Sequence, residues 1–146
     1  MEKNKGGRPR SFYCNETLKK QVDAFFEYCD SKKEVYTDDK GRTTVIRKPY
    51  TITGLCLYLE INGDTFREYI KGVYDDKDNK FSATFTCARK KIENYIEEGT
   101  LNGTINHNAG AFNLKNNFNW KEKQEIDLKV EDITVTVTND NDEIDD

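Results

Sequence analysis

The sequence has no long apolar run, and this absence excludes a membrane-spanning helix. Such a helix needs about 20 consecutive apolar residues, and the 146-residue chain contains no run of that kind. The first ten residues, MEKNKGGRPR, are charged but lack the apolar segment of a secretory signal peptide. Together these absences predict a cytoplasmic protein with no membrane partner.

The usual ligands of zinc are scarce as well. The chain has one histidine, and its four cysteines lie far apart without a C-x-x-C pair. A structural zinc site takes four His or Cys ligands, usually in closely spaced pairs, so we expect no metal site. Cys56 and Cys87 lie within apolar stretches, which predicts small buried side chains in a reducing compartment.

Signatures of catalysis are missing too. The sequence contains no phosphate-binding loop of the form G-x-x-x-x-G-K-[ST]. The single histidine, His107, has no Ser or Cys nucleophile in a recognisable arrangement with it. We therefore expect no enzymatic activity and no cofactor, and we interpret His107 as the first residue of a helix.

Charged residues are plentiful, at 34% of the chain, but they are distributed unevenly. Residues 1–123 carry 22 Lys and Arg against 18 Asp and Glu, a net charge of +4, whereas residues 124–146 carry one Lys against nine acids, a net charge of −8. A mildly basic body favours a polyanionic partner. The acidic end favours a protein partner, or it only keeps the chain in solution.

Residues 1–14 form a basic, glycine-rich arm that we expect to be disordered. Its segment GGRPR carries Arg8 and Arg10 on either side of a proline, which keeps the backbone extended. Arginines on such a segment can enter the narrow minor groove of A·T-rich DNA, or they can simply contact phosphates.

A helix and a hairpin are predicted next. Asn15 is expected to cap a helix from about residue 16 to residue 31, because Leu18, Val22, Phe25, Phe26 and Cys29 recur at helical spacing. The stretch EVYTDDKGRTTVIR then alternates apolar and polar residues on both sides of the turn sequence DDKG. This pattern is typical of a β-hairpin or wing, or else of an exposed loop.

Residues 51–72 have the pattern of a helix-turn-helix. Thr51 or Thr53 can cap a first short helix, and the turn sequence INGD follows. Asn62 and Gly63 are expected to adopt left-handed conformations in that turn. Two short helices joined in this way form a helix-turn-helix, or alternatively a helical hairpin within a bundle.

The second of these helices is expected to be capped by Asp64 and to end at Gly72. In a helix-turn-helix this second helix enters the major groove of DNA. The outward residues suited to contact bases or phosphates are Thr65, Arg67 and Lys71, although Glu60 and Glu68 oppose tight binding of DNA.

A long helix is predicted from about residue 81 to residue 101. Phe81, Phe85, Ala88, Ile92, Tyr95 and Ile96 form its apolar stripe. Arg89, Lys90 and Lys91 are expected to form a basic cluster on the flank, which either contacts phosphates or is an ordinary solvated face.

The stretch NAGAFNLKNNFNW, residues 108–120, contains five Asn and no acid. Its small residues Ala109, Gly110 and Ala111 allow another helix to approach closely. Asn is a poor interior helix former that prefers caps and turns, so Asn116, Asn117 and Asn119 are expected to end the helix and Trp120 to fold back onto the body. The residues alone predict a short packed helix without catalytic chemistry.

Three blocks of the sequence resemble the small subunit of a tailed-bacteriophage terminase. They are PYTITGLCLYLEINGDTFREY, FSATFTCARKKIENYIEEGTLNG and AGAFNLKNNFNWKEKQEID, and they keep the family's order over about residues 49–127. The family pairs an N-terminal Thr-x-x-Gly-Leu helix-turn-helix with a later Gly-Ala-x-Phe-x-Leu-Lys-Asn-x-x-x-Trp-Lys-x-Lys block. Residues 112–123 fit the Phe-x-Leu-Lys-Asn-x-x-x-Trp-Lys-x-Lys part of this block, with Asn119 where a Gly is common, whereas Gly110 and Ala111 precede Phe112 without the intervening residue. The acidic end matches no motif.

The resemblance implies a protein that recognises viral double-stranded DNA when packaging starts in the host cytoplasm. It further implies a ring of many copies that recruits and regulates the ATPase-nuclease large subunit. The residues expected to bind DNA are Arg8, Arg10, Thr65, Arg67, Lys71, Arg89, Lys90 and Lys91. Those expected at the oligomer interface are Ala109, Gly110, Ala111, Phe112, Phe118 and Trp120.

The expected fold is mainly α-helical. The predicted organisation is a disordered basic arm (1–14), a helix-turn-helix DNA-binding domain (15–74), a helical oligomerisation core (80–123), a β-strand segment (124–138) and an acidic disordered tail (139–146). Two other functions fit parts of the pattern. One is a dimeric helix-turn-helix transcription regulator, and the other is a structural interaction protein that does not touch DNA.

Overall fold

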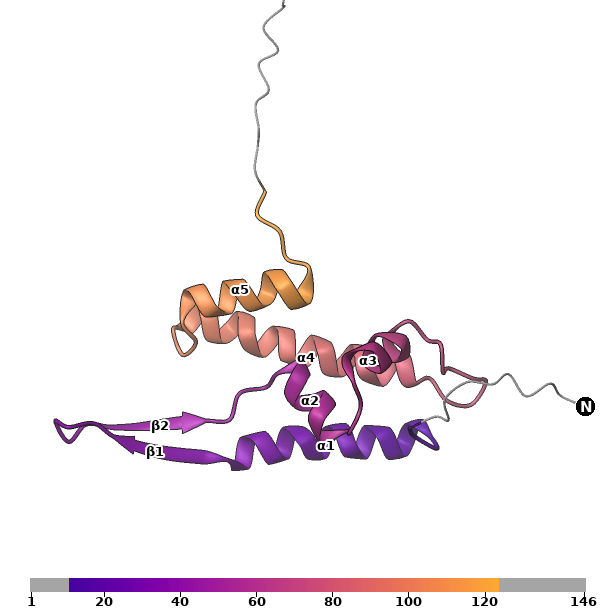
Figure 1. The fold of residues 1–146 in the computed structure, drawn as a ribbon, viewed down its shortest axis with the longest axis horizontal. Coiled ribbons are helices and arrows are strands. Elements are labelled where there is room, and N and C mark those ends of the chain that lie inside the picture. The colour runs from indigo at the N-terminus through magenta and orange to yellow at the C-terminus, as the bar shows by residue number, and fades with distance from the viewer. Residues whose placement is uncertain (1–10, 124–146) are drawn as a thin grey trace, which may run out of the picture.

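The computed structural model describes residues 11–123. In this part of the chain five helices and a two-stranded hairpin follow one another (Figure 1). The elements are α1 (Asn15–Ser31), β1 (Lys33–Thr37), β2 (Thr43–Arg47), α2 (Ile52–Tyr58), α3 (Gly63–Ile70), α4 (Phe81–Asn102) and α5 (His107–Phe118). The mainly helical fold class and the β-hairpin are thus confirmed, whereas the predicted segments 124–138 and 139–146 lie outside the described residues.

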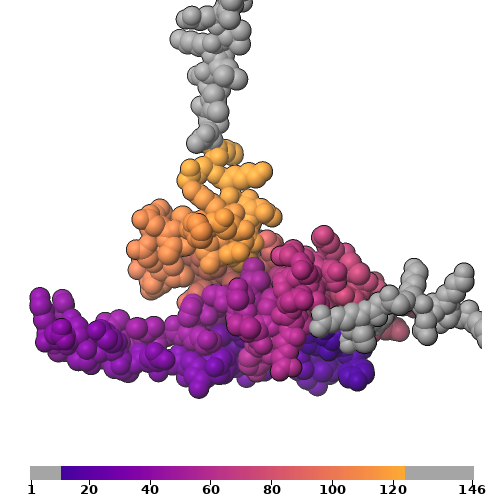
Figure 2. All heavy atoms as spheres, viewed as in Figure 1, coloured from indigo at the N-terminus to yellow at the C-terminus, as the bar shows by residue number. Residues whose placement is uncertain are grey.

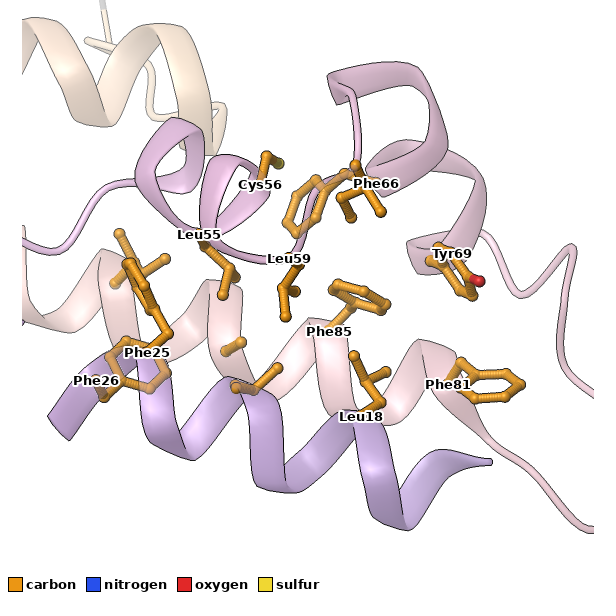
Figure 3. Packing of buried hydrophobic residues seen from close by; sticks show 14 of the residues in the cluster. Leu18, Phe25, Phe26, Leu55, Cys56, Leu59, Phe66, Tyr69, Phe81 and Phe85 are labelled. Atoms are coloured by element: carbon orange, nitrogen blue, oxygen red, sulfur yellow. The ribbon is translucent and has the colours of Figure 1, made fainter. Parts of the chain in front are cut away.

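Helix α4 is the centre of the fold. It packs against α1, α3 and α5, and the pair α2–α3 lies over the layer that α1 and α4 form (Figures 1 and 3). The core is rich in aromatic rings: Phe85 on α4 lies 4.9 Å from Tyr69 and 5.4 Å from Phe66 between ring centroids. Burial of one such side chain contributes roughly 1.5–3 kcal/mol, so these rings hold α3 firmly on α4.

Helix α1 begins one residue earlier than predicted. Cys14, not Asn15, is the N-cap, and its Sγ accepts the backbone N–H of Thr17 at 3.5 Å. The side chain of Asn15 instead accepts a hydrogen bond from the Thr84 hydroxyl at 2.7 Å, which connects α1 to α4. The prediction that Cys87 is buried is also wrong, since this side chain on α4 is exposed.

The turn between α2 and α3 differs from the prediction as well. The left-handed residue is Glu60, with φ 55°. Asn62 is the N-cap of α3, because its Oδ1 accepts the backbone N–H of Thr65 at 2.8 Å. Helix α3 therefore starts at Gly63, and Asp64 lies in its first turn, where a carboxylate favours the positive end of the helix dipole.

The end of α5 agrees with the prediction at Asn119 and Trp120, whereas Asn116 and Asn117 still lie within the helix. Asn119 is left-handed, with φ 61°, and caps the helix. The indole N–H of Trp120 donates to Glu93 on α4 at 2.7 Å, so the chain folds back onto the body there. His107 is the first residue of α5, as predicted, and Thr51 is the cap of α2.

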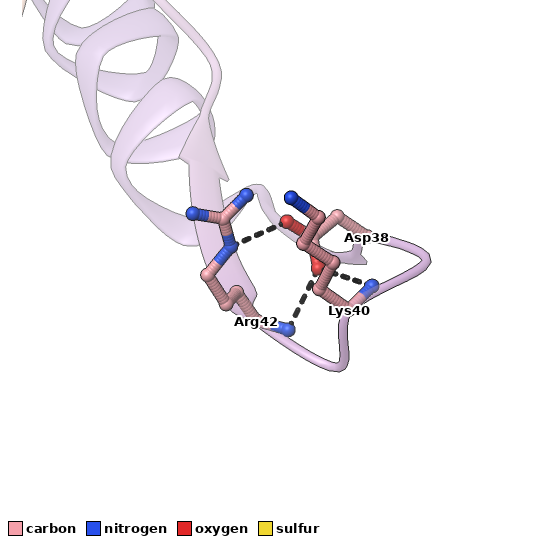
Figure 4. Close-up of polar contacts among 3 residues, drawn as sticks. All are labelled: Asp38, Lys40 and Arg42. Carbon is pink, nitrogen blue, oxygen red and sulfur yellow. Dashed lines mark hydrogen bonds and ion pairs between the residues drawn. The ribbon is translucent and has the colours of Figure 1, made fainter.

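The hairpin extends away from the helices as a narrow ribbon (Figures 1 and 2). Its strands are antiparallel, with Val35 opposite Val45, and all ten strand residues are exposed. At its tip the Asp38 carboxylate accepts the backbone N–H groups of Lys40 and Arg42 and the Arg42 Nε–H at 2.7–2.9 Å (Figure 4). These hydrogen bonds hold the pKa of Asp38 below its usual value.

Candidate nucleic-acid interface

A surface groove runs between α3 and the C-terminal end of α5. One part of it is lined by Ile52, Phe66, Arg67, Ile70, Lys71, Arg89, Asn116, Asn117 and Asn119. The adjoining part is lined by Thr51, Ile52, Thr53, Cys56, Gly63, Phe66, Arg67, Asn113 and Asn117. The two parts share four residues, so they form one continuous surface, which we call the α3–α5 groove.

Two of the predicted DNA-binding residues on α3 lie in this groove. Arg67 forms an ion pair with Asp64, one turn earlier, and both side chains are largely exposed. An exposed pair of this kind contributes about 0.2–1 kcal/mol, so Arg67 can exchange Asp64 for a phosphate at little cost. Lys71 caps the end of α3 and is exposed beside it.

Thr65 does not point outward as predicted. Only 9% of this residue is exposed, and it lies on the face that packs into the core. The reason is helical spacing. Thr65 precedes Tyr69 by four residues, so it falls on the buried stripe that also carries Phe66 and Tyr69.

The three basic residues of α4 do not form one cluster. Consecutive helical residues point about 100° apart, and each side chain has a different neighbour. Arg89 donates to the backbone carbonyl of Asn117 at 2.8 Å, Lys90 pairs with Glu93 at 2.7 Å, and the Lys91 ammonium lies 4.1 Å from the centre of the Phe26 ring. Arg89 alone of the three lines the α3–α5 groove.

The asparagines at the end of α5 were not among the predicted site residues. Asn113, Asn116, Asn117 and Asn119 all line the groove opposite α3. Asn117 donates to the Asn113 side chain at 3.0 Å, which orders the row. Because an Asn amide both donates and accepts hydrogen bonds, it can contact base edges or phosphates. The sequence did point to these residues, because residues 108–120 contain five Asn and no acid. Formation of a helix does not require so many Asn.

The arm that carries Arg8 and Arg10 begins beside α3. Its arginines lie outside the described residues, but the residues that follow are fixed. The backbone N–H of Ser11 donates to the Tyr69 hydroxyl at 3.2 Å, and Phe12 is buried with its ring 5.6 Å from that of Tyr69. The arm therefore leaves the body at the same helix that contributes Arg67 and Lys71.

The predicted oligomer-interface residues divide into two groups. Gly110 and Phe118 are buried within the chain: Gly110 packs against Thr100 of α4, and Phe118 lies beneath the Arg89 guanidinium at 5.1 Å. The prediction that Gly110 and Phe118 contact another subunit is therefore wrong, because both residues already pack against α4 of the same chain. The accessible candidates are Ala109, Ala111, Phe112 and Trp120, and Phe112 is 70% exposed.

The chain belongs to a family of bacteriophage DNA-packaging proteins. Residues 7–126 match the family described as DNA-packaging protein gp3. The match spans the arm's end, all of the described helices and the hairpin, and it supports a role in genome packaging and the resemblance found in the sequence. None of the curated proteins compared with the chain matches it. Within residues 11–123 no helix is long and apolar enough to cross a membrane.

Proposed function

We propose that the protein is the small subunit of the phage terminase and that it binds viral double-stranded DNA through the α3–α5 groove. The observation that carries this proposal is the convergence of basic groups from separate elements, Arg67 and Lys71 of α3 and Arg89 of α4, on a groove that the asparagines of α5 also line. Helices α2 and α3 would act as a helix-turn-helix, with α3 presented to the major groove.

The charges that line the groove support DNA binding of moderate affinity that weakens as the salt concentration rises. The groove carries three cations, while Asp64 and Glu68 on α3 reduce its positive potential. Removing one cation that binds a phosphate makes the plot of log affinity against log salt shallower by about 0.9. The arm leaves the body beside Tyr69, and its residues Arg8 and Arg10 would contact the same DNA molecule.

The experiment is a binding titration with viral DNA at two salt concentrations. The variant Arg67→Ala/Lys71→Ala is expected to weaken binding and to decrease the salt slope by about 2. The matched control Lys19→Ala/Lys20→Ala removes equal charge from α1, outside the groove, and is expected to keep the slope. Equal slopes for both variants would refute the groove as the DNA site.

We also propose a ring of many copies, formed through the exposed face of α5. Phe112 on α5 and Leu101 at the adjoining end of α4 are both large apolar side chains that are mostly exposed, and such side chains are typical of protein contacts. Native mass spectrometry is expected to find one closed assembly of many copies, which Phe112→Glu disperses. A wild-type dimer would instead support the second candidate, a transcription regulator that binds a palindrome.

The acidic C-terminal end would recruit the large subunit in the host cytoplasm, since it carries nine acids on 23 residues. Deletion of residues 128–146 is expected to leave DNA affinity unchanged and to abolish stimulation of the large subunit's ATPase. Full stimulation by the shortened chain would contradict this role.

A further inference from the structure

The hairpin is an unusual element, because nothing in the described part of the chain covers it. Val35, Tyr36, Val45 and Ile46 are 67%, 61%, 54% and 51% exposed. A two-stranded ribbon with free edges is marginally stable and offers unpaired backbone groups to other strands. An exposed ribbon of this kind is therefore suited to accept a third strand.

The hydrogen-bond register identifies which backbone groups are free on β1. Lys48 donates its N–H to the Lys32 carbonyl at 3.2 Å, and Asp38 donates to the Arg42 carbonyl at 3.0 Å. Hydrogen-bonded pairs alternate with non-bonded pairs in an antiparallel ladder, so Glu34 and Tyr36 bond to β2. The N–H and C=O groups of Lys33, Val35 and Thr37 consequently point away from β2, along the free edge.

The ribbon is also basic at its root, the end at residues 32 and 48 where it joins the helices. Residues 32–48 carry six Lys and Arg against three acids, a net charge of +3, and Asp38 is already occupied by Arg42. At the root the Lys32 and Lys48 ammonium groups lie 5.4 Å and 5.8 Å from the centre of the Tyr28 ring. A partner strand that is apolar on one face and continues into acidic residues would match this surface.

The C-terminal segment of the chain has this composition. Ile133, Val135 and Val137 alternate with threonines over five residues, the length of β1, and an acidic stretch, NDNDEIDD, follows directly. β-Branched residues of this kind have high strand propensity. Nine residues, 124–132, connect this segment to Lys123, a reach of about 30 Å when extended.

We propose that residues 133–137 add to the free edge of β1 as an antiparallel third strand. In the antiparallel direction the segment runs from the tip of the ribbon to its root. Val135 would then lie opposite Val35, on the face that also carries Val45, and the acidic residues after Val137 would reach Lys32 and Lys48. DNA is the less suitable occupant, because four exposed apolar side chains and the acids Glu34 and Asp39 do not favour phosphates. The proposal does not depend on the proposed function.

The test is residue-resolved amide hydrogen exchange on the full chain without DNA. The amides of Lys33, Val35 and Thr37 are expected to exchange at least about tenfold more slowly than in Val135→Pro, which removes one N–H from the added strand. Asn141→Pro, which lies beyond the strand, is the matched control and is expected to keep the protection. The amides of Thr43, Val45 and Arg47, on the opposite edge, are expected to exchange rapidly in every variant.

Three results would overturn the proposal. One is equal exchange of the β1 edge amides in the wild type and Val135→Pro, and another is protection that appears only when duplex DNA is added. The third comes from zero-length carbodiimide cross-linking of the wild type, a measurement that needs no variant. Cross-links are expected from the acids after Val137 to Lys32, Lys33 or Lys48 at the root; cross-links confined to Lys40 at the tip would contradict the antiparallel direction.

Discussion

The contact between Glu93 and Trp120 gives a sharp prediction about what holds the C-terminal end of the body. Glu93 is 9% exposed on α4. Its carboxylate accepts the Trp120 indole N–H and the Lys90 ammonium, each at 2.7 Å. Trp120 also donates its backbone N–H to the Leu114 carbonyl at 3.3 Å. Glu93 therefore fixes the point from which residues 121–146 leave the helices.

Removal of this carboxylate has a calculable cost. A hydrogen bond to a charged group contributes about 1.5–3 kcal/mol, and a neutral one about 1 kcal/mol. Glu93→Gln keeps an acceptor for Trp120 but loses the charge, so it is expected to lower the free energy of unfolding by about 1 kcal/mol. Glu93→Ala removes both hydrogen bonds, and it is expected to cost about 2–3 kcal/mol.

The same contact predicts a dependence on pH. The hydrogen bonds from Lys90 and then from Trp120 lower the pKa of Glu93 below its ordinary value. A carboxyl group with a lowered pKa in the folded state binds protons more readily when unfolded, so stability falls as the pH falls. The contribution is present above the unfolded-state pKa, about 4.3, and is lost as the pH drops through the lower folded-state pKa. Glu93→Gln is expected to remove this part of the acid dependence.

Denaturant unfolding followed by fluorescence is the assay, because Trp120 is the only tryptophan. The free energy of unfolding would be measured at neutral pH and at several values below the unfolded-state pKa of Glu93. Glu98→Gln, the same change at an exposed position of α4, is the control. The reasoning is refuted if Glu93→Gln and Glu98→Gln have equal effects, or if Glu93→Gln keeps the acid dependence of the wild type.

Two further predictions concern local packing and capping. Gly110→Ala places a methyl group against Thr100 at the α4–α5 contact, and it is expected to lower the free energy of unfolding by about 1–3 kcal/mol; a neutral effect in thermal unfolding would show that the helices can separate freely. Asn62→Ala removes the N-cap of α3 and is expected to cost about 1 kcal/mol. Because α3 carries Arg67, this variant is also expected to weaken DNA binding, whereas unchanged DNA affinity would argue against α3 as the contact helix.

The helices were predictable from the sequence because apolar side chains recur strongly along them. Phe81, Phe85, Ile92 and Ile96 repeat at helical spacing, and α4 follows within one residue of the predicted bounds. The caps were less predictable, because several polar residues near each helix start can accept the same amides. Asn15 is one example: it is a suitable cap, but its side chain is used by Thr84 and a thiol serves as the cap.

The candidate site was predictable only in part, because a groove depends on which elements meet. The position of Arg67 on the exposed face of α3 follows from the local sequence. By contrast, the separation of Arg89 from Lys90 and Lys91 depends on α5 and α1, which pack on different sides of α4. The sequence places three cations together on the chain, whereas the helix directs them toward different neighbours.

The position of α5 gives a physical reason for the composition of residues 108–120. One face of α5 must be small or apolar to pack on α4, and Gly110, Leu114 and Phe118 fulfil this requirement. The asparagines occupy the part of the surface that lies beside α3, where an acid would oppose the approach of a phosphate. An uncharged amide keeps its hydrogen-bonding capacity there without repelling the phosphate. One face of this short helix would therefore be selected for packing on α4, and another face for binding DNA.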